Sequence, residues 1–113
     1  MATIKVTLKT GLKVGEEVHL EAELREVIAG DLIEATEESE KVVMTHDGYM
    51  LLLSNTLVGL HTLRRQIVRI GEHPGPLTLG ELKKLSGHDL DKLQAEAIKL
   101  DQASLAGVTG QGK

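Results

Sequence analysis

The first 25 residues contain two runs in which apolar and polar side chains alternate. The apolar positions of the two runs are Ile4, Val6 and Leu8, and then Val18, Leu20, Ala22 and Leu24. A period of two is typical of a strand with one buried face. The glycine-flanked loop 10–15 between the runs predicts an antiparallel β-hairpin. Because an isolated hairpin is only marginally stable, we expect other elements to cover its apolar face.

Helical signals follow the hairpin. A helix is predicted from Gly30 or Asp31 to Lys41, with acidic residues near its start and a lysine at its end. Residues 45–48 are typical of a turn, and Asp47 is the expected N-cap of a helix over residues 48–65. Leucines at helical spacing make this the longest predicted helix. Residues 66–70 then return to β preference and favour a short third strand.

Two capping patterns predict the last helices. Thr78 and Glu81 have the spacing of a capping box, and Ser86 with Asp89 repeats it ahead of a leucine-rich helix. Residues 107–113 contain three glycines, and we expect a flexible C-terminal segment there. The sequence thus predicts an α+β fold over residues 1–106. It is an N-terminal antiparallel β-hairpin packed on about four α-helices, with a short third strand near residues 66–70.

Composition narrows the class of protein. The chain is 41% hydrophobic and 27% charged, with one tyrosine, no phenylalanine, no tryptophan and no cysteine. Its core is therefore aliphatic, and a disulfide framework or a thiol nucleophile is excluded. The most apolar stretch, residues 50–53, is far shorter than the ~20 residues that cross a bilayer. The N-terminus has no apolar signal segment, so the cytoplasm is the expected location and a membrane partner is not expected.

Charge argues against a nucleic-acid partner. The net charge is −4, and residues 1–45 hold ten acidic and five basic side chains, which would repel a phosphate backbone. The one basic cluster is Arg64, Arg65 and Arg69. These arginines either contact phosphate, as in a small nucleic-acid-binding regulator, or pair with nearby acidic residues, and we favour the second interpretation.

Candidate chemistry is sparse. Residues 107–113 match the spacing G-x-x-x-x-G-K of a phosphate-binding loop, but the hydroxyl residue and the helix that this loop needs do not follow. The five histidines show no ligand spacing, and the glutamates 34, 37, 38 and 40 are typical of a solvated helix face. We therefore expect no catalytic residue, no cofactor and no metal, and a protein that acts by binding other proteins.

Three segments carry a resemblance to a known family. They are residues 24–35 (LREVIAGDLIEA), residues 60–71 (LHTLRRQIVRIG), and residues 77–94, with Leu77-Thr78, Leu82, Leu85-Ser86 and the final DLDKLQ. Their order resembles that of the tail assembly chaperones of Mu-like and related contractile-tailed phages, over roughly residues 3–104.

This resemblance implies a non-enzymatic protein that binds the tape measure protein and keeps it soluble while the tail is built, with the tail tube protein as a further candidate partner. It also implies a longer product made by ribosomal frameshifting in many members. A structural tail or adaptor subunit that forms a homo-oligomeric ring stays open as an alternative. The expected client-binding positions are apolar residues of the two long helices: Leu51, Leu53, Leu57, Leu60, Leu93, Ile98 and Leu100.

Overall fold

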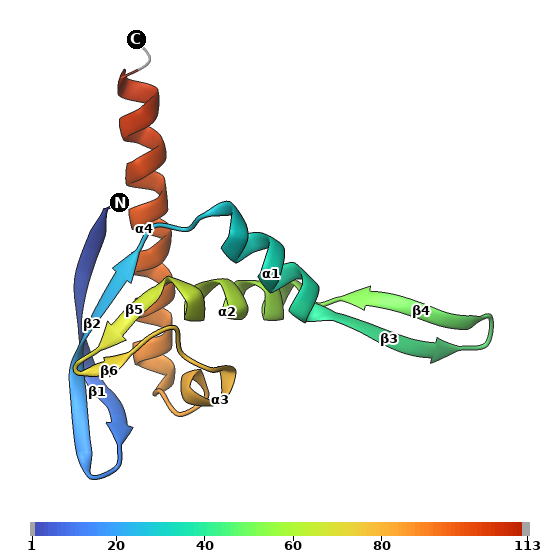
Figure 1. The fold of residues 1–113 in the computed structure, drawn as a ribbon, viewed down its shortest axis with the longest axis horizontal. Coiled ribbons are helices and arrows are strands. Elements are labelled where there is room, and N and C mark those ends of the chain that lie inside the picture. The colour runs from blue at the N-terminus through green and yellow to red at the C-terminus, as the bar shows by residue number, and fades with distance from the viewer. Residues whose placement is uncertain (1, 112–113) are drawn as a thin grey trace.

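The body of the molecule is an antiparallel sheet packed against the C-terminal helix (Figure 1). The computed structural model describes residues 2–111 and the side chains of residues 2–103. Its four-stranded sheet has the order β1-β2-β5-β6, with bounds Thr3–Val14, Glu17–Arg25, Ile67–Ile70 and His73–Pro74. The predicted N-terminal hairpin is β1 and β2, and the predicted third strand is β5. The α+β class is confirmed.

A long excursion separates β2 from β5, although these two strands are hydrogen-bonded neighbours. It consists of α1 (Ala29–Ser39), β3 (Glu40–Thr45), β4 (Gly48–Leu53) and α2 (Asn55–Gln66). The helices α1 and α2 lie side by side, and the β3–β4 hairpin continues outward from their ends (Figure 1). We call residues 40–53 the arm. The chain ends with α3 (Leu79–Leu82) and α4 (Gly87–Gln111).

The predicted helix over residues 48–65 is wrong in its first third. Residues 48–53 form β4, paired with β3 from Glu40↔Leu53 to Thr45↔Gly48. The helix begins only at Asn55, and its N-cap is Ser54, whose Oγ accepts the N–H of Leu57 at 3.3 Å. Asp47 belongs instead to the hairpin turn, which Gly48 follows with a φ of 112°. An Asp-Gly pair is a standard hairpin signal, and here it decides the local structure.

An aliphatic core joins the sheet to α2, α3 and α4. It contains only small and branched apolar residues, as the composition predicts: Val6, Leu8, Leu12, Ala22, Leu24, Leu63, Ile67, Ile70, Leu77, Leu82, Leu85, Leu93, Ala97 and Leu100. Two expected client-binding residues, Leu93 and Leu100, belong to this core and are 0% and 6% exposed.

A buried carboxylate fastens α4 to the first strand. The register between β1 and β2 shifts between Thr7 and Leu12, so the amides in this bulge leave the strand ladder. Asp89, which is fully buried, accepts three of them, from Lys9 at 2.7 Å, Thr10 at 3.0 Å and Gly11 at 2.8 Å. Gly11 has a φ of 84°, and a Cβ there would lie 2.5 Å from the carbonyl oxygen of His19, so the bulge requires glycine.

The predicted capping box at Thr78 and Glu81 is confirmed by reciprocal hydrogen bonds of 3.1 and 2.9 Å. The predicted cap of the last helix is also present, since Ser86 accepts the N–H of Asp89 at 3.2 Å. The helix α4 extends to Gln111, and residues 112–113 lie outside the described part, so the flexibility expected of residues 107–113 stays a prediction. No helix in the described residues combines the length and apolar character that a bilayer crossing requires.

The Asp89 contact predicts an acid-sensitive stability. Burial alone would raise the pKa of Asp89, but the three backbone N–H donors, helped by Ser86, hold it below the ordinary value of 3.8. A lowered pKa means that the contact stabilises the fold fully above the unfolded-state pKa and is lost as the pH falls through the folded-state pKa. We expect Asp89→Asn to lose about 3 kcal/mol at pH 7, because an amide cannot replace a charged acceptor of three N–H groups.

Urea unfolding at several pH values measures this effect. The difference between the wild type and Asp89→Asn should narrow below pH 4, where the wild-type carboxylate becomes protonated. The exposed Asp91 of the same helix supplies the control, Asp91→Asn, which should change the stability by less than about 0.5 kcal/mol. A constant difference across this pH range would show that Asp89 does not act through its charge.

Candidate functional site

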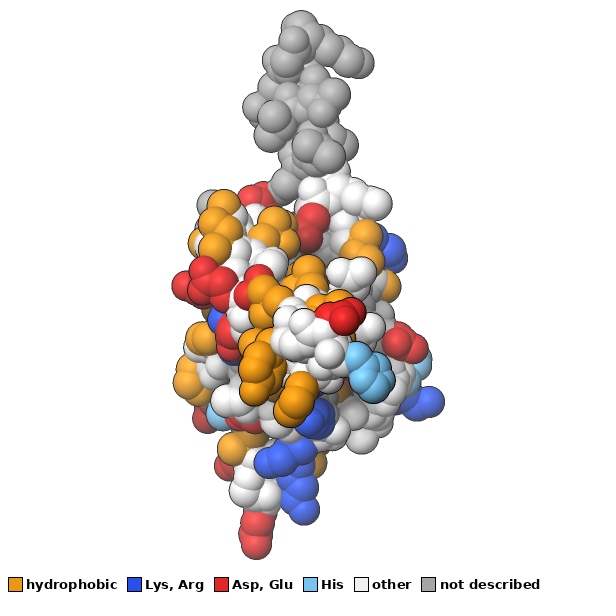
Figure 2. All heavy atoms as spheres, turned by 90° about the vertical axis from the view of Figure 1, so that its right-hand side faces the viewer, with side chains coloured by type: hydrophobic (Ala, Val, Ile, Leu, Met, Phe, Trp, Pro, Cys, Tyr) orange, Lys and Arg blue, Asp and Glu red, His pale blue; other side chains and the backbone are white. Residues whose placement is uncertain are grey.

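The arm is apolar and uncovered. Every residue of β3 and β4 is exposed, and the exposed fractions of their large hydrophobic residues run from 37% to 77%. These residues are Val42, Val43, Met44, Tyr49, Met50, Leu51, Leu52 and Leu53. Figure 2, which looks along the arm toward the body, shows hydrophobic side chains gathered on this side of the molecule. A contiguous apolar surface formed by eight large exposed residues is typical of a protein-binding site.

Both faces of the arm are apolar. Opposed residues of an antiparallel pair lie on the same face, so the register assigns each side chain to a face. One face carries Val42 and Leu51, Met44 and Tyr49, and Leu53. The other carries Val43 and Met50, and Leu52 opposite Lys41. A hairpin on a protein surface normally has one wet face, so this pattern indicates an element made to be covered on two sides.

The tip of the arm holds the only aromatic residue of the chain. Tyr49 is 77% exposed, the highest value among the exposed large hydrophobic residues of the described chain. A tyrosine gains most from contact with a partner, because it combines a large apolar ring with a hydroxyl group. The core uses no aromatic residue at all, so the position of Tyr49 favours a binding role over a packing role.

An apolar groove lies between α1, α2 and α4. It has a volume of about 570 Å³ and is lined by Leu32, Asn55, Val58, Gly59, Thr62, Leu63, Gln66, Gln94, Ala97, Ile98 and Asp101. We call this feature the groove. Leu32 and Ile98 stand at its edge and are 48% and 57% exposed, whereas Leu63 and Ala97 belong to the core. The groove is therefore a second apolar surface, on the body rather than on the arm.

The structure divides the expected client-binding residues into three groups. Leu51 and Leu53 are exposed on the arm, and Ile98 is exposed at the groove. Leu57 and Leu60 are half-buried on α2 and line a small pocket with residues of α3 and α4. Leu93 and Leu100 are buried, so a client could reach them only if the core opened.

The sequence reasoning missed most residues of the arm, namely Val42, Val43, Met44, Tyr49 and Met50. It ended the first helix at Lys41, assigned residues 42–44 to no element, and placed residues 49–50 at the start of the next helix. The signal that could have found the arm is Asp47-Gly48, flanked on both sides by runs of β-branched and other apolar residues.

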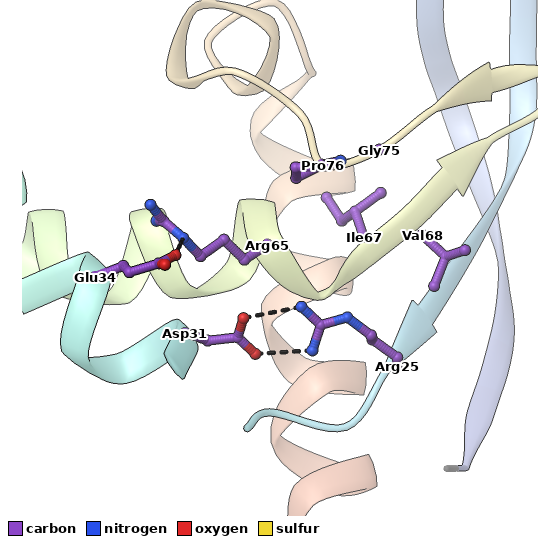
Figure 3. Close-up of a pocket in the computed structure, with 8 residues that line it drawn as sticks. All are labelled: Arg25, Asp31, Glu34, Arg65, Ile67, Val68, Gly75 and Pro76. Carbon is purple, nitrogen blue, oxygen red and sulfur yellow. Dashed lines mark hydrogen bonds and ion pairs between the residues drawn. The ribbon is translucent and has the colours of Figure 1, made fainter. Parts of the chain in front are cut away.

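A pocket of about 380 Å³ near the start of α1 is lined by charges that pair with one another (Figure 3). Arg25 donates two parallel hydrogen bonds of 2.8 Å to the carboxylate of Asp31, which also accepts the N–H of Ile28 at 2.9 Å. The Arg25 guanidinium holds the pKa of Asp31 below its ordinary value, against the opposing effect of burial. This bidentate pair fixes the first turn of α1 against the end of β2.

Ion pairs also join α1 to α2 along the helices that carry the arm. Arg64 donates to Glu38 at 2.7 Å, and Arg65 donates to Glu34 at 3.0 Å and to Glu38 as well. Arg64 also donates from Nε to Nδ1 of His61 at 2.9 Å. Burial lowers the pKa of His61, and the charge of Arg64 lowers it further, so this ring accepts the hydrogen bond in its neutral form. The network binds α1 to α2, the two helices between which the arm is inserted.

Arg69, the third member of the basic cluster, donates to Glu21 at 2.7 Å and to Glu23 at 3.1 Å. All three arginines of the cluster therefore have carboxylate partners, as the ion-pair interpretation expected. A phosphate backbone would have to displace these carboxylates. The geometry consequently favours a structural role for the cluster over a nucleic-acid site.

Three of the five histidines lie within 4 Å of a glutamate. Within the described residues, no group of three or more His, Asp or Glu side chains is placed to hold a metal ion. The histidine–glutamate pairs are His73 with Glu81, His61 with Glu38 at 3.9 Å, and His19 with Glu17 at 3.8 Å. The apolar arm and the groove are thus the features that best define a functional surface.

Known proteins similar to this chain share the designation gp41. Residues 8–113 match the family described as tail assembly protein gp41. The Mu-like prophage FluMu protein gp41 of Haemophilus influenzae is 37% identical over 111 residues, which cover 97% of this chain and 87% of the relative. The probable tail assembly protein gp41 of Escherichia phage Mu is 39% identical over 106 residues, which cover 90% of this chain and 74% of the relative.

A further protein of phage Mu, the probable tail assembly protein FS-gp41, is also 39% identical over 106 residues, and there the matched part makes up 56% of the relative. No solved structure matches the chain.

The difference between arm and core positions predicts a difference in stability. Leu51→Ser should change the free energy of unfolding by less than about 0.5 kcal/mol, because the side chain is exposed on the arm. Leu93→Ser should cost about 4 kcal/mol, because it leaves a cavity and buries a hydroxyl group in the core. Urea unfolding of dilute protein, followed by circular dichroism, compares the two. Equal losses would show that the arm is part of the cooperative core.

Proposed function

Since this chain belongs to the tail assembly protein gp41 family of Mu-like phages, we propose that it is a non-enzymatic chaperone that binds the tape measure protein and keeps it soluble during tail assembly. The family is one of tail assembly proteins rather than a class of enzymes. The proposal adds a client and a mode of action to this role in tail assembly. The bacterial cytoplasm, where the tail would be built, is the proposed location.

The observation that carries the proposal is the exposed apolar arm. A chaperone that keeps another protein in solution needs an apolar contact surface on a body that stays folded and dissolved. The body has its own aliphatic core and a charged surface, while the arm leaves eight large hydrophobic residues in contact with water. Such an arm can bind apolar client segments while the charged body prevents their aggregation.

The chemistry of the arm suits a client of varied sequence. Its eight large hydrophobic side chains are aliphatic or thioether groups apart from Tyr49, and Met44 and Met50 are unbranched and flexible. Methionine adapts to irregular apolar surfaces and is common where one protein binds many partners. The exposed strands also present backbone N–H and C=O groups along their outer edges, to which an extended client segment could add. The arm thus recognises apolar surface rather than one sequence.

Coexpression with the tape measure protein of the same phage or prophage tests the proposal. We expect a soluble complex by size-exclusion chromatography with light scattering, whereas the tape measure protein alone should be insoluble. Val42→Asp on the arm should weaken the complex at least tenfold, because it places a charge in the apolar contact.

The matched control is Val18→Asp, which changes the same residue type at an exposed position of β2, far from the arm along the chain. It should leave the complex intact. If the tape measure protein stays insoluble with the wild-type chain, the chaperone proposal is wrong. A chain that is retained in purified, finished tails would instead support the structural-subunit alternative.

A further inference from the structure

The arm cannot be a stable element by itself. A two-stranded hairpin is marginally stable in water, and this one also exposes apolar side chains on both faces. Its hydrophobic residues expose on the order of 800 Å² over the two faces together, which is comparable to the ~800 Å² that each partner buries in an interface of standard size. The arm therefore carries enough apolar surface to form one complete protein interface.

The arm also cannot fold back onto its own body. The strand β3 begins at Glu40, directly after Ser39 ends α1, and only Ser54 separates β4 from α2. The base is further fixed because Ser54 donates its N–H to the carbonyl of Ser39 at 3.4 Å. With no flexible linker on either side, the arm continues away from α4 (Figure 1). Whatever covers it must come from another molecule.

The groove offers a surface of matching character on the same chain. Its apolar edge, Leu32 and Ile98, stands on two different helices, with Val58 of α2 between them in sequence. Asn55 and Gln94 also line it, and their amides can both donate to and accept from a strand edge. A lining that combines apolar side chains with amides is suited to a short apolar hairpin whose backbone edges need hydrogen bonds.

We propose that the arm of one copy docks into the groove of a second copy, so that the chain associates head to tail. The exposed arm needs a partner as soon as it forms. A second copy of the chain meets this need because it is present wherever the chain is made. The two surfaces in this contact are different, so each copy keeps one arm and one groove free, and further copies close a ring or extend a filament. The contact involves no client, but it uses the same arm as the proposed function, so a client and a second copy would compete for the arm.

Paired variants test this contact on the chain alone. Leu51→Asp disables the arm and leaves the groove intact, while Ile98→Asp disables the groove and leaves the arm intact. Light scattering after size exclusion should give a multiple of 12.2 kDa for the wild type and 12.2 kDa for each variant. An equimolar mixture of the two variants should form a dimer, because one intact arm still meets one intact groove.

Tyrosine fluorescence gives a second measurement without a label. Tyr49 is the only aromatic residue of the chain, so its quenching by acrylamide reports the exposure of the arm. Quenching should fall as the wild-type concentration rises and should fall in the mixture relative to either variant alone. Val42→Asp and Leu32→Asp form a second pair if either first variant fails to fold, and Val18→Asp should associate as the wild type does.

Three results would overturn the proposal. The wild type could be a monomer at every concentration, Ile98→Asp and Leu32→Asp could both associate normally, or two folded monomeric variants could fail to form a dimer when mixed. The second result would indicate arm-to-arm pairing. None of these results bears on solubilisation of the tape measure protein, which the coexpression experiment measures separately.

Discussion

The carboxylate of Asp89 accepts three backbone N–H groups from the bulge of β1, and through them it joins the first strand of the body to the last helix. Buried amides that have left a strand ladder need acceptors, and a charged carboxylate is among the strongest. The contact fixes the start of α4, and α4 in turn supplies Leu93, Ala97 and Leu100 to the core. Ile98 of the same helix forms one edge of the groove, so the position of the groove also depends on this carboxylate.

A different set of interactions orients the arm. The Arg25–Asp31 pair anchors the start of α1, and the ion pairs of Arg64 and Arg65 with the glutamates of α1 bind the two helices together. The body can therefore present an apolar hairpin at a fixed direction without burying it. If the client and a second copy both use the arm, as we propose, they compete for it. In the absence of a client, the arm of each copy would be covered by the groove of another copy.

The sequence predicted the elements whose signals are local. Alternation over residues 4–8 and 18–24 predicted the hairpin, and the side chains of Thr78 and Ser86 predicted their caps. The arm was missed because Leu51, Leu52 and Leu53 are apolar in succession, which fits a buried helix as well as a strand covered on both faces. The pairing of residues 40–45 with 48–53 decides between these, and the Asp47-Gly48 turn between the two segments is the local signal of that pairing.

The lack of tertiary information in the sequence also explains why the predicted client-binding residues were only partly on the surface. Leu93 and Leu100 have the same apolar character as Leu51 and Ile98, and the sequence could not tell which of them the fold buries. The Asp89 contact was also beyond reach, because it spans 78 to 80 positions along the chain. Burial is a property of the tertiary arrangement, so a predicted list of apolar contact residues necessarily mixes core and surface.

The order of the elements along the chain has a consequence for biosynthesis. A ribosome makes residues 40–53 before it makes α4, so the residues of the arm are present in a nascent chain while Ile98 and the anchoring Asp89 have not yet been translated. During that interval the arm of the nascent chain could dock into the groove of another copy, but the nascent chain has no groove of its own to bind an arm. Finished copies released by earlier ribosomes on the same messenger are the molecules able to receive it, which would make assembly begin at the polysome.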